Sequence, residues 1–290
     1  MFESIFLVLA VLFSIATMTA VVRGRSIGWF VPLWFLVSLA STELAPWLLA
    51  SQVGLLIFGA IFGDSGSSGW YWGSVLLSLS ALATLGILAR HFDTGKIFER
   101  ALATALGDDF DSLIPLARRH RLSRQIDSKE WAHPFTFKRA GVRVSADIAY
   151  DSGGKRNLLD VYTSVTAGDK RPVMLQIHGG AWLLGHKAEQ ALPLLHHMAN
   201  LGWVCVSINY RLSPMATFPD HIIDVKKAIA WVRENIADWG GDPDFIAVTG
   251  GSAGGHLASL AALSANYAPW QPGFEDVDTD AGAGSSFASM

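Results

Sequence analysis

Ser252 is the residue of this chain whose neighbours best suit it to act as a nucleophile. It stands in Gly250-Gly-Ser-Ala-Gly254, a G-x-S-x-G pattern that follows an apolar, β-branched run and precedes an apolar helical pattern. In such a strand–turn–helix context the serine occupies a strained turn, and small residues two positions away on either side let strand and helix pack closely. The pattern therefore predicts a nucleophile elbow with an exposed hydroxyl. A glycine-rich loop without chemistry is the alternative.

A second glycine-containing segment, His178-Gly-Gly-Ala-Trp182, ends another apolar run. Acyl transfer requires N–H donors aimed at the oxygen that becomes negative in the tetrahedral intermediate. Gly179 and Gly180 can direct their N–H groups into one space because no β-carbon blocks the approach, and the N–H of Ala253 would be their partner. We therefore expect an oxyanion hole formed by Gly179, Gly180 and Ala253, with the N–H of Ala181 as a substitute on the first loop.

The remaining members of a catalytic triad are not identified by the residues. His178 is expected to order its loop by hydrogen bonding rather than to act as the base. His256 is the only histidine after Ser252, and it lies in the first turn of the same helix, where it could not reach back to the hydroxyl. We expect it to be a half-buried residue beside the elbow. The acidic residues of the tail are expected to lie in a solvated loop; they are Glu275, Asp276, Asp278 and Asp280.

Together these motifs resemble the α/β-hydrolase superfamily, in the hormone-sensitive-lipase-like and carboxylesterase branch. The resemblance extends from about Val142 to about Asp280. Further segments that resemble strands and helices of the family are Leu159-Asp-Val-Tyr162, Val204–Pro214 and Phe218–Ile236. The whole layout is most similar to membrane-anchored Lip-type esterases, in which hydrophobic segments precede the hydrolase domain.

The resemblance implies a membrane-bound serine hydrolase of carboxylic esters that needs no cofactor and acts on small acyl esters or lipids. In the family the nucleophile is followed by the acid and then the histidine. The family's sixth strand would lie near the low-complexity end, Ala281–Met290, so the chain is expected to be cut off there and to lack the acid and the base. The alternatives are an amide hydrolase of the formamidase type and a truncated, non-catalytic membrane protein.

The hydrolase region shows short apolar runs that alternate with helical patterns, which predicts a mostly parallel sheet covered on both faces. A turn at Asp151–Gly154 joins the first two strands. Strands are expected near 142–149, 157–163, 172–178, 203–209 and 245–250. Helices are expected near 187–201, 219–239 and 253–265. In the middle helix an apolar stripe at helical spacing should pack on the sheet; it comprises Ile222, Val225, Ile229, Val232 and Ile236. Trp182 and Trp231 are also expected to be packing residues.

The composition is that of a two-part protein. Hydrophobic residues make up 51% of the chain and charged residues 16%, and the mean hydropathy is +0.33. These values indicate a membrane region. A net charge of −3 and a pI near 6.3 give no reason to expect nucleic-acid binding. The single cysteine, Cys205, lies in an apolar strand pattern and is expected in the core. The sequence contains no metal-ligand spacing and no phosphate-binding loop.

The domain organisation follows from the distribution of apolar and charged residues. We expect a transmembrane region at 1–90, a linker with lid helices at 91–141 and a partial α/β-hydrolase domain at 142–290. Ser4–Val22 and Trp70–Ala89 are each about one bilayer long. Ile27–Phe62, between them, is either a helical hairpin or one tilted, kinked span with an interfacial extension. The chain thus has three or four spans.

Basic residues predict the orientation of the spans. Arg23 and Arg25 follow the first span, and the cluster of Arg90, Lys96 and Arg100 follows the last. The positive-inside rule would place both groups in the cytoplasm, which is possible only with three spans. With four spans the groups fall on opposite sides, and the larger group, after the last span, decides. In both cases the hydrolase region is expected in the cytoplasm. The stretch from Leu113 to Arg121 has basic and apolar faces. It is expected to be a linker helix, a helix resting on anionic lipid, or part of a lid.

Overall fold

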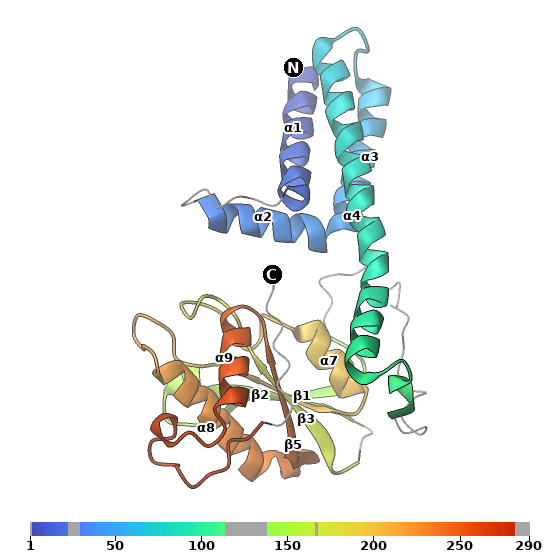
Figure 1. Cartoon of the computed structure of the whole chain (residues 1–290). Coiled ribbons are helices and arrows are strands. Elements are labelled where there is room, and N and C mark those ends of the chain that lie inside the picture. Colours follow the sequence, from blue (N-terminus) through green and yellow to red (C-terminus); the bar gives the residue numbers. More distant parts are fainter. Residues whose placement is uncertain (1, 23–29, 114–137, 166–167, 282–290) are drawn as a thin grey trace. The chain divides into compact units, whose positions relative to one another are not determined.

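A computed structural model of the chain describes residues 2–22, 30–113, 138–165 and 168–281 (Figure 1). The chain forms two compact units, Met1–Ile126 and Asp127–Met290. The first unit is helical, and the second combines helices with a β-sheet. Residues 114–137 of the linker expected at 91–141, which include most of the basic and apolar segment, lie outside the described residues.

Three helices of the first unit are long and apolar enough to cross a membrane. They are α1 (Phe2–Val21), α3 (Ala45–Phe62) and α4 (Ser68–Leu106). A fourth helix, α2 (Val31–Glu43), has only 13 residues, which is too short to span a bilayer. Figure 1 shows α2 lying crosswise to α1 and α3. This arrangement favours one span with a crosswise extension over a hairpin, and therefore three spans over four.

The helix α4 continues well beyond the length of a membrane span. Its N-cap is Ser67, whose side chain accepts a hydrogen bond from the N–H of Trp70, and it ends at Gly107 with φ +97°. The helix runs without a break through the residues after Ala89, so the span and the first part of the linker form a single helix.

A buried polar cluster joins the three long helices. The hydroxyls of Thr17 in α1 and Ser80 in α4 lie 2.8 Å apart. The amide nitrogen of Gln52 in α3 donates to both, at 3.0 and 2.8 Å. All three side chains are buried, whereas large apolar residues of these helices face outward. Polar bonds inside and apolar side chains outside are the pattern of helices that associate in lipid.

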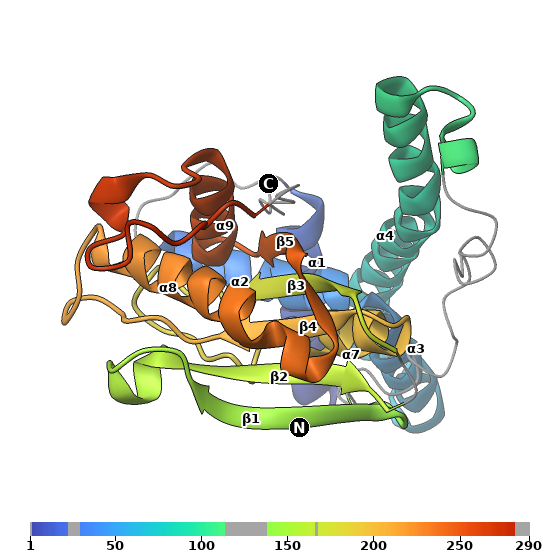
Figure 2. The same ribbon diagram turned by 90° about the horizontal axis from the view of Figure 1, so that it is seen from below.

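The second unit is built on a five-stranded sheet in the order β1-β2-β4-β3-β5. The strands are β1 (Val142–Ala149), β2 (Leu158–Ser164), β3 (Arg171–Ile177), β4 (Val204–Ile208) and β5 (Gly241–Gly250). Figure 2 shows β1 at one edge of the sheet and β5 at the other. All five expected strands are present, although β5 begins four residues before the expected position.

The expectation of a mostly parallel sheet is wrong. The strand β3 is parallel to β4 and to β5, but β2 is antiparallel to both β1 and β4. The turn at Asp151–Gly154 is too short for the crossover that parallel neighbours require, so β1 and β2 form an antiparallel pair. The sheet is therefore mixed.

Helices cover both faces of this sheet, as expected. On one face, α8 (Asp220–Asn235) and α9 (Ala253–Leu263) pack on the larger core. The whole predicted stripe is fully buried, including Ile236, which directly follows α8. On the other face, α7 (Leu192–Asn200) packs on Tyr162, Met174 and Cys205. Trp182 and Trp231 are partly buried against the larger core. The burial of Cys205 raises the pKa of its thiol, and its position in the core is confirmed.

Two glycines allow β5, α9 and β3 to approach each other closely. A β-carbon on Gly254, in the first turn of α9, would overlap the carbonyl oxygen of Ile177 at the end of β3. A β-carbon on Gly250 would lie 2.5 Å from the oxygen of Gly254 and 2.7 Å from that of Ile177. These contacts are with backbone atoms, which cannot move aside as a side chain would. The close packing expected around Ser252 thus depends on glycine at both positions.

The apolar helices predict how the chain fractionates. Because three helices are long and apolar enough to cross a bilayer, the full chain should remain in the membrane pellet after an alkaline carbonate wash. Detergent should then release it, which serves as the control against aggregation. Recovery in the carbonate supernatant would contradict the membrane-spanning interpretation.

The packing at Gly254 predicts a large effect from a single methyl group. Gly254→Ala should lower the free energy of unfolding of the hydrolase unit by about 3 kcal/mol, because the methyl group meets a carbonyl oxygen that cannot withdraw. Gly251→Ala is the matched control: its β-carbon would meet nothing within 4 Å, so the change should be under about 0.5 kcal/mol. Urea titration of the full chain in detergent, followed by tryptophan fluorescence, measures both. Equal effects of the two variants would refute the packing argument.

Candidate active site

Ser252 occupies a strained turn between β5 and α9. Its backbone has φ 54° and ψ −121°, a conformation that is costly for a residue with a β-carbon and that tends to occur at functional sites. The residue is exposed, and its carbonyl oxygen accepts the N–H of His256 at 2.9 Å in the first turn of the helix. The sharp turn thus presents Ser252 at the end of β5 instead of burying it between strand and helix.

The segment after β3 lies directly against this turn. A β-carbon on Gly179 would be 2.6 Å from the oxygen of Gly251 and 3.3 Å from the β-carbon of Ser252. Beyond Gly179 the chain turns sharply, with positive φ at Gly180, Ala181 and Trp182. The structure therefore brings together the two motifs that the sequence separates by about seventy residues.

The predicted oxyanion donors differ in whether their N–H groups are already hydrogen-bonded. The N–H of Gly179 donates to the side-chain oxygen of Gln190 at 2.8 Å, and the amide nitrogen of Gln190 donates to the oxygen of Gly179 at 3.4 Å. The N–H groups of Gly180 and Ala253 have no hydrogen-bond acceptor among the described residues. Gly180 and Ala253 are thus available to a ligand, whereas Gly179 is available only if Gln190 releases it.

His178 is fully buried beneath the loop. Its Nδ1 lies 2.8 Å from the oxygen of Gly179, and its ring stacks on Tyr210 with centroids 4.4 Å apart. The Tyr210 hydroxyl in turn donates to the His178 carbonyl at 3.1 Å. Burial lowers the pKa of His178, so its ring is neutral at pH 7. These contacts suit the loop-ordering role expected from the sequence.

His256 differs from its expectation. It is exposed rather than half-buried, because its ring lies edge-on against Trp182, with centroids 5.3 Å apart, outside the contact between helix and sheet. Within the described part of the chain, no hydrogen bond joins the His256 ring to Ser252. Among the described residues, His256 is therefore not an oriented base for Ser252.

The acidic residues of the tail are exposed, as expected. A backbone hydrogen bond from Asp280 lowers the pKa of Asp278, and an ion pair with Arg233 at 3.0 Å lowers it further. The neighbouring Thr279 is fully buried and accepts a hydrogen bond from Lys226 at 3.1 Å. The tail therefore packs on α8 through alternate residues while its carboxylates face solvent.

The loop after β3, residues 178–187, is called the glycine loop below. Sequence reasoning missed the residues that hold its far end. Lys187 is buried and pairs with the buried Asp160 of β2 at 2.5 Å and with Asp147 at 2.8 Å. Its N–H donates to Asn209 and its oxygen accepts from Ser207, both at 2.8 Å. No periodicity singles out Lys187 or Gln190, because their partners lie on distant strands and loops. The only available signal was that Asp160 interrupts an apolar run.

Comparison with known proteins shows which proteins this region resembles. Residues 159–285 match the BD-FAE family of domains. The chain is 51% identical over 189 residues to esterase LipQ of Mycobacterium tuberculosis, covering 63% of this chain and 45% of that protein. It is 40% identical over 289 residues to the probable carboxylic ester hydrolase LipM of the same organism, covering 94% of this chain and 63% of that protein. The chain therefore spans between about half and two thirds of the length of these relatives.

Solved structures of similar chains include a thermophilic esterase from Thermogutta terrifontis with bound butyrate. It is 30% identical, with 50% of this chain and 52% of that chain covered and a TM-score of 0.43. A bifunctional GH43-CE protein of Bacteroides eggerthii is 29% identical, with 51% and 21% covered and a TM-score of 0.45. Residues 159–285 of this chain thus resemble a BD-FAE domain, and the chain resembles the Lip-type esterases.

Proposed function

We propose that this chain is a serine hydrolase of carboxylic esters, held at a membrane by its N-terminal helices. The observation that carries the proposal is the position of Ser252. This residue is exposed on a strained turn, and the glycine loop lies so close that a β-carbon on Gly179 would be 3.3 Å from that of Ser252. The names of the relatives, esterase and carboxylic ester hydrolase, support the same reaction class.

In the proposed reaction the Ser252 Oγ attacks the carbonyl carbon of the ester while a base removes the hydroxyl proton. The carbonyl oxygen becomes negative and accepts hydrogen bonds from Ala253 and from Gly180, with Gly179 or Ala181 as a third donor. Collapse of this intermediate breaks the bond to the alcohol, which leaves with the proton. Water then hydrolyses the acyl–serine ester by the same steps.

Turnover requires an imidazole base and an acid that orients it. His256 is directed at Trp182 and is not hydrogen-bonded to Ser252, so we do not assign the base to it. We infer that the base and its acid come from outside the described residues. Nucleophile reactivity and turnover must therefore be tested separately.

The membrane part of the proposal rests on the three apolar helices. They would keep the hydrolase unit close to a bilayer, which suits acyl esters or lipids as substrates. We propose that the hydrolase unit lies on the cytoplasmic side, from the basic residues that flank the spans.

Covalent labelling tests the nucleophile. Treatment of the full chain in detergent with an alkyl fluorophosphonate should modify Ser252 slowly but selectively, as identified by mass spectrometry of its peptide. Ser252→Ala should abolish the modification, because no other side chain is held at the elbow. Ser259→Ala, in the same helix, is the matched control and should be labelled like the unchanged chain. Equal modification of the Ser252→Ala protein would refute the assignment.

Turnover of this chain should be slow. Because no described residue is an oriented base for Ser252, hydrolysis of p-nitrophenyl butyrate should be slower than in a relative with a complete triad by a factor on the order of 10⁴ to 10⁶. The initial rate, corrected for the Ser252→Ala background, measures this. A rate comparable to that of the relative would mean that a histidine of this chain acts as the base.

A further inference from the structure

A half-buried guanidinium, that of Arg156, lies beside the candidate site. Its Nη1 donates to the oxygen of Gly185 at 3.0 Å. No carboxylate of the described residues lies within ion-pair distance of it. A guanidinium carries five N–H donors in a planar fork, so donors remain for a ligand. An uncompensated positive charge next to an apolar surface attracts an anion.

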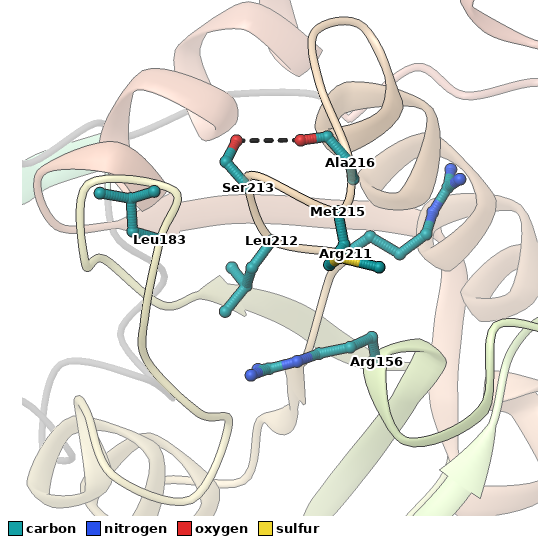
Figure 3. Close-up of a pocket in the computed structure, with 7 residues that line it drawn as sticks. All are labelled: Arg156, Leu183, Arg211, Leu212, Ser213, Met215 and Ala216. Atoms are coloured by element: carbon teal, nitrogen blue, oxygen red, sulfur yellow. Dashed lines mark hydrogen bonds between the residues drawn. The ribbon is translucent and has the colours of Figure 1, made fainter.

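Arg156 lines a cavity of about 270 Å³. The walls contributed by Leu183, Leu212 and Met215 are apolar. Figure 3 shows the side chain of Arg156 extending beneath Leu212, with Leu183 on the opposite side. A small cavity with apolar walls and one directed charge is typical of a site that orients a small ligand.

The second arginine of the cavity, Arg211, does not contribute a free charge. It forms hydrogen bonds with both carboxylate oxygens of the fully buried Asp224, at 2.7 to 3.0 Å. This partner raises the pKa of Arg211. In Figure 3 its guanidinium points away from Arg156. Arg156 therefore supplies the unbalanced positive charge of the cavity.

Topology places the cavity and Ser252 at the same ends of the strands, namely the carboxyl ends of the parallel strands. Because β2 is antiparallel to β4, its start lies beside the end of β4, where the N–H of Asn209 donates to Leu158 at 2.9 Å. The parallel strands β3 and β5 also end here, with the glycine loop and with Ser252. Ligands of such sheets bind at the carboxyl ends of the parallel strands.

Direct contacts connect the cavity to the glycine loop. The N–H of Leu184 donates to Gly180 at 3.0 Å, so the Leu183 wall belongs to the turn that begins at the proposed oxyanion hole. The N–H of Ser213, another lining residue, donates to Trp182 at 2.8 Å. Trp182 in turn contacts His256, in the helix that follows Ser252.

We propose that this cavity binds a singly charged oxyanion on the substrate, with Arg156 as its specificity-determining residue. The substrates would then be esters that carry a second, anionic group: a carboxylate on a soluble half-ester or the phosphodiester of a lipid headgroup. The substrate assignment rests on the proposed hydrolase function, whereas anion binding itself does not. An arginine fork recognises such oxygens through two parallel hydrogen bonds.

Ligand binding to the full chain in detergent micelles tests this proposal. The probes are monoethyl succinate and ethyl succinamate, a neutral analogue of the same shape, and ligand-observed NMR measures their dissociation constants. The half-ester should bind at least about tenfold more tightly than the amide. Arg156→Gln should abolish this preference. Lys155→Gln, which removes an exposed neighbouring charge, should preserve it.

The same experiment distinguishes the outcomes. Displacement of the half-ester by monomeric dihexanoyl phosphatidylglycerol would support the lipid source, and no displacement would support the soluble acid. Equal binding of the two probes to the unchanged chain would overturn the proposal, even if Arg156→Gln fails to fold. Fluorophosphonate labelling of Ser252 in the unchanged chain tests the hydrolase function separately. Labelling without anion preference refutes only the anion site, and preference without labelling refutes only the hydrolase assignment.

Discussion

The close contact between the end of β3 and the first turn of α9 is the constraint on which the candidate site depends. The carbonyl oxygen of Ile177 occupies the space that a side chain at position 254 would need. The glycine loop begins at His178, the residue after Ile177. This contact therefore sets the distance between the loop and Ser252. A larger residue at 250 or 254 would separate Ser252 from the proposed oxyanion donors even if every side chain of the site were retained.

The glycine loop is held at both ends before any substrate binds. The side-chain amide of Gln190 accepts from the N–H of Gly179 and donates to its carbonyl oxygen. Lys187 fixes the following segment through its ion pair with the buried Asp160. Such an ion pair contributes little net stability, because desolvation offsets the attraction, but loss of one partner is costly. Its role here is to fix geometry. Donors that are already oriented need no reorganisation as charge develops on the substrate oxygen.

The sequence predicted the features that depend on local patterns. The elbow turn, the strand positions and the stripe of α8 follow from neighbouring residues, and the apolar helices follow from composition. Pairing between distant segments was harder. The antiparallel pair β1–β2 was implied by the short turn at Asp151–Gly154, but the antiparallel β2–β4 pair depends on strands that are separated by β3 and α7. The exposure of His256 and the Gln190–Gly179 bonds depend on tertiary contacts that no local pattern encodes.

The structure of the phosphonylated chain tests the central claim most directly, because the phosphonyl oxygen stands in for the oxyanion of the tetrahedral intermediate. We expect the adduct on the Ser252 Oγ. Its oxygen should lie about 2.7–3.1 Å from the nitrogen of Ala253 and from a nitrogen of the Gly179–Ala181 loop. An adduct on another residue, or a phosphonyl oxygen directed into solvent away from both groups, would contradict this account of the site.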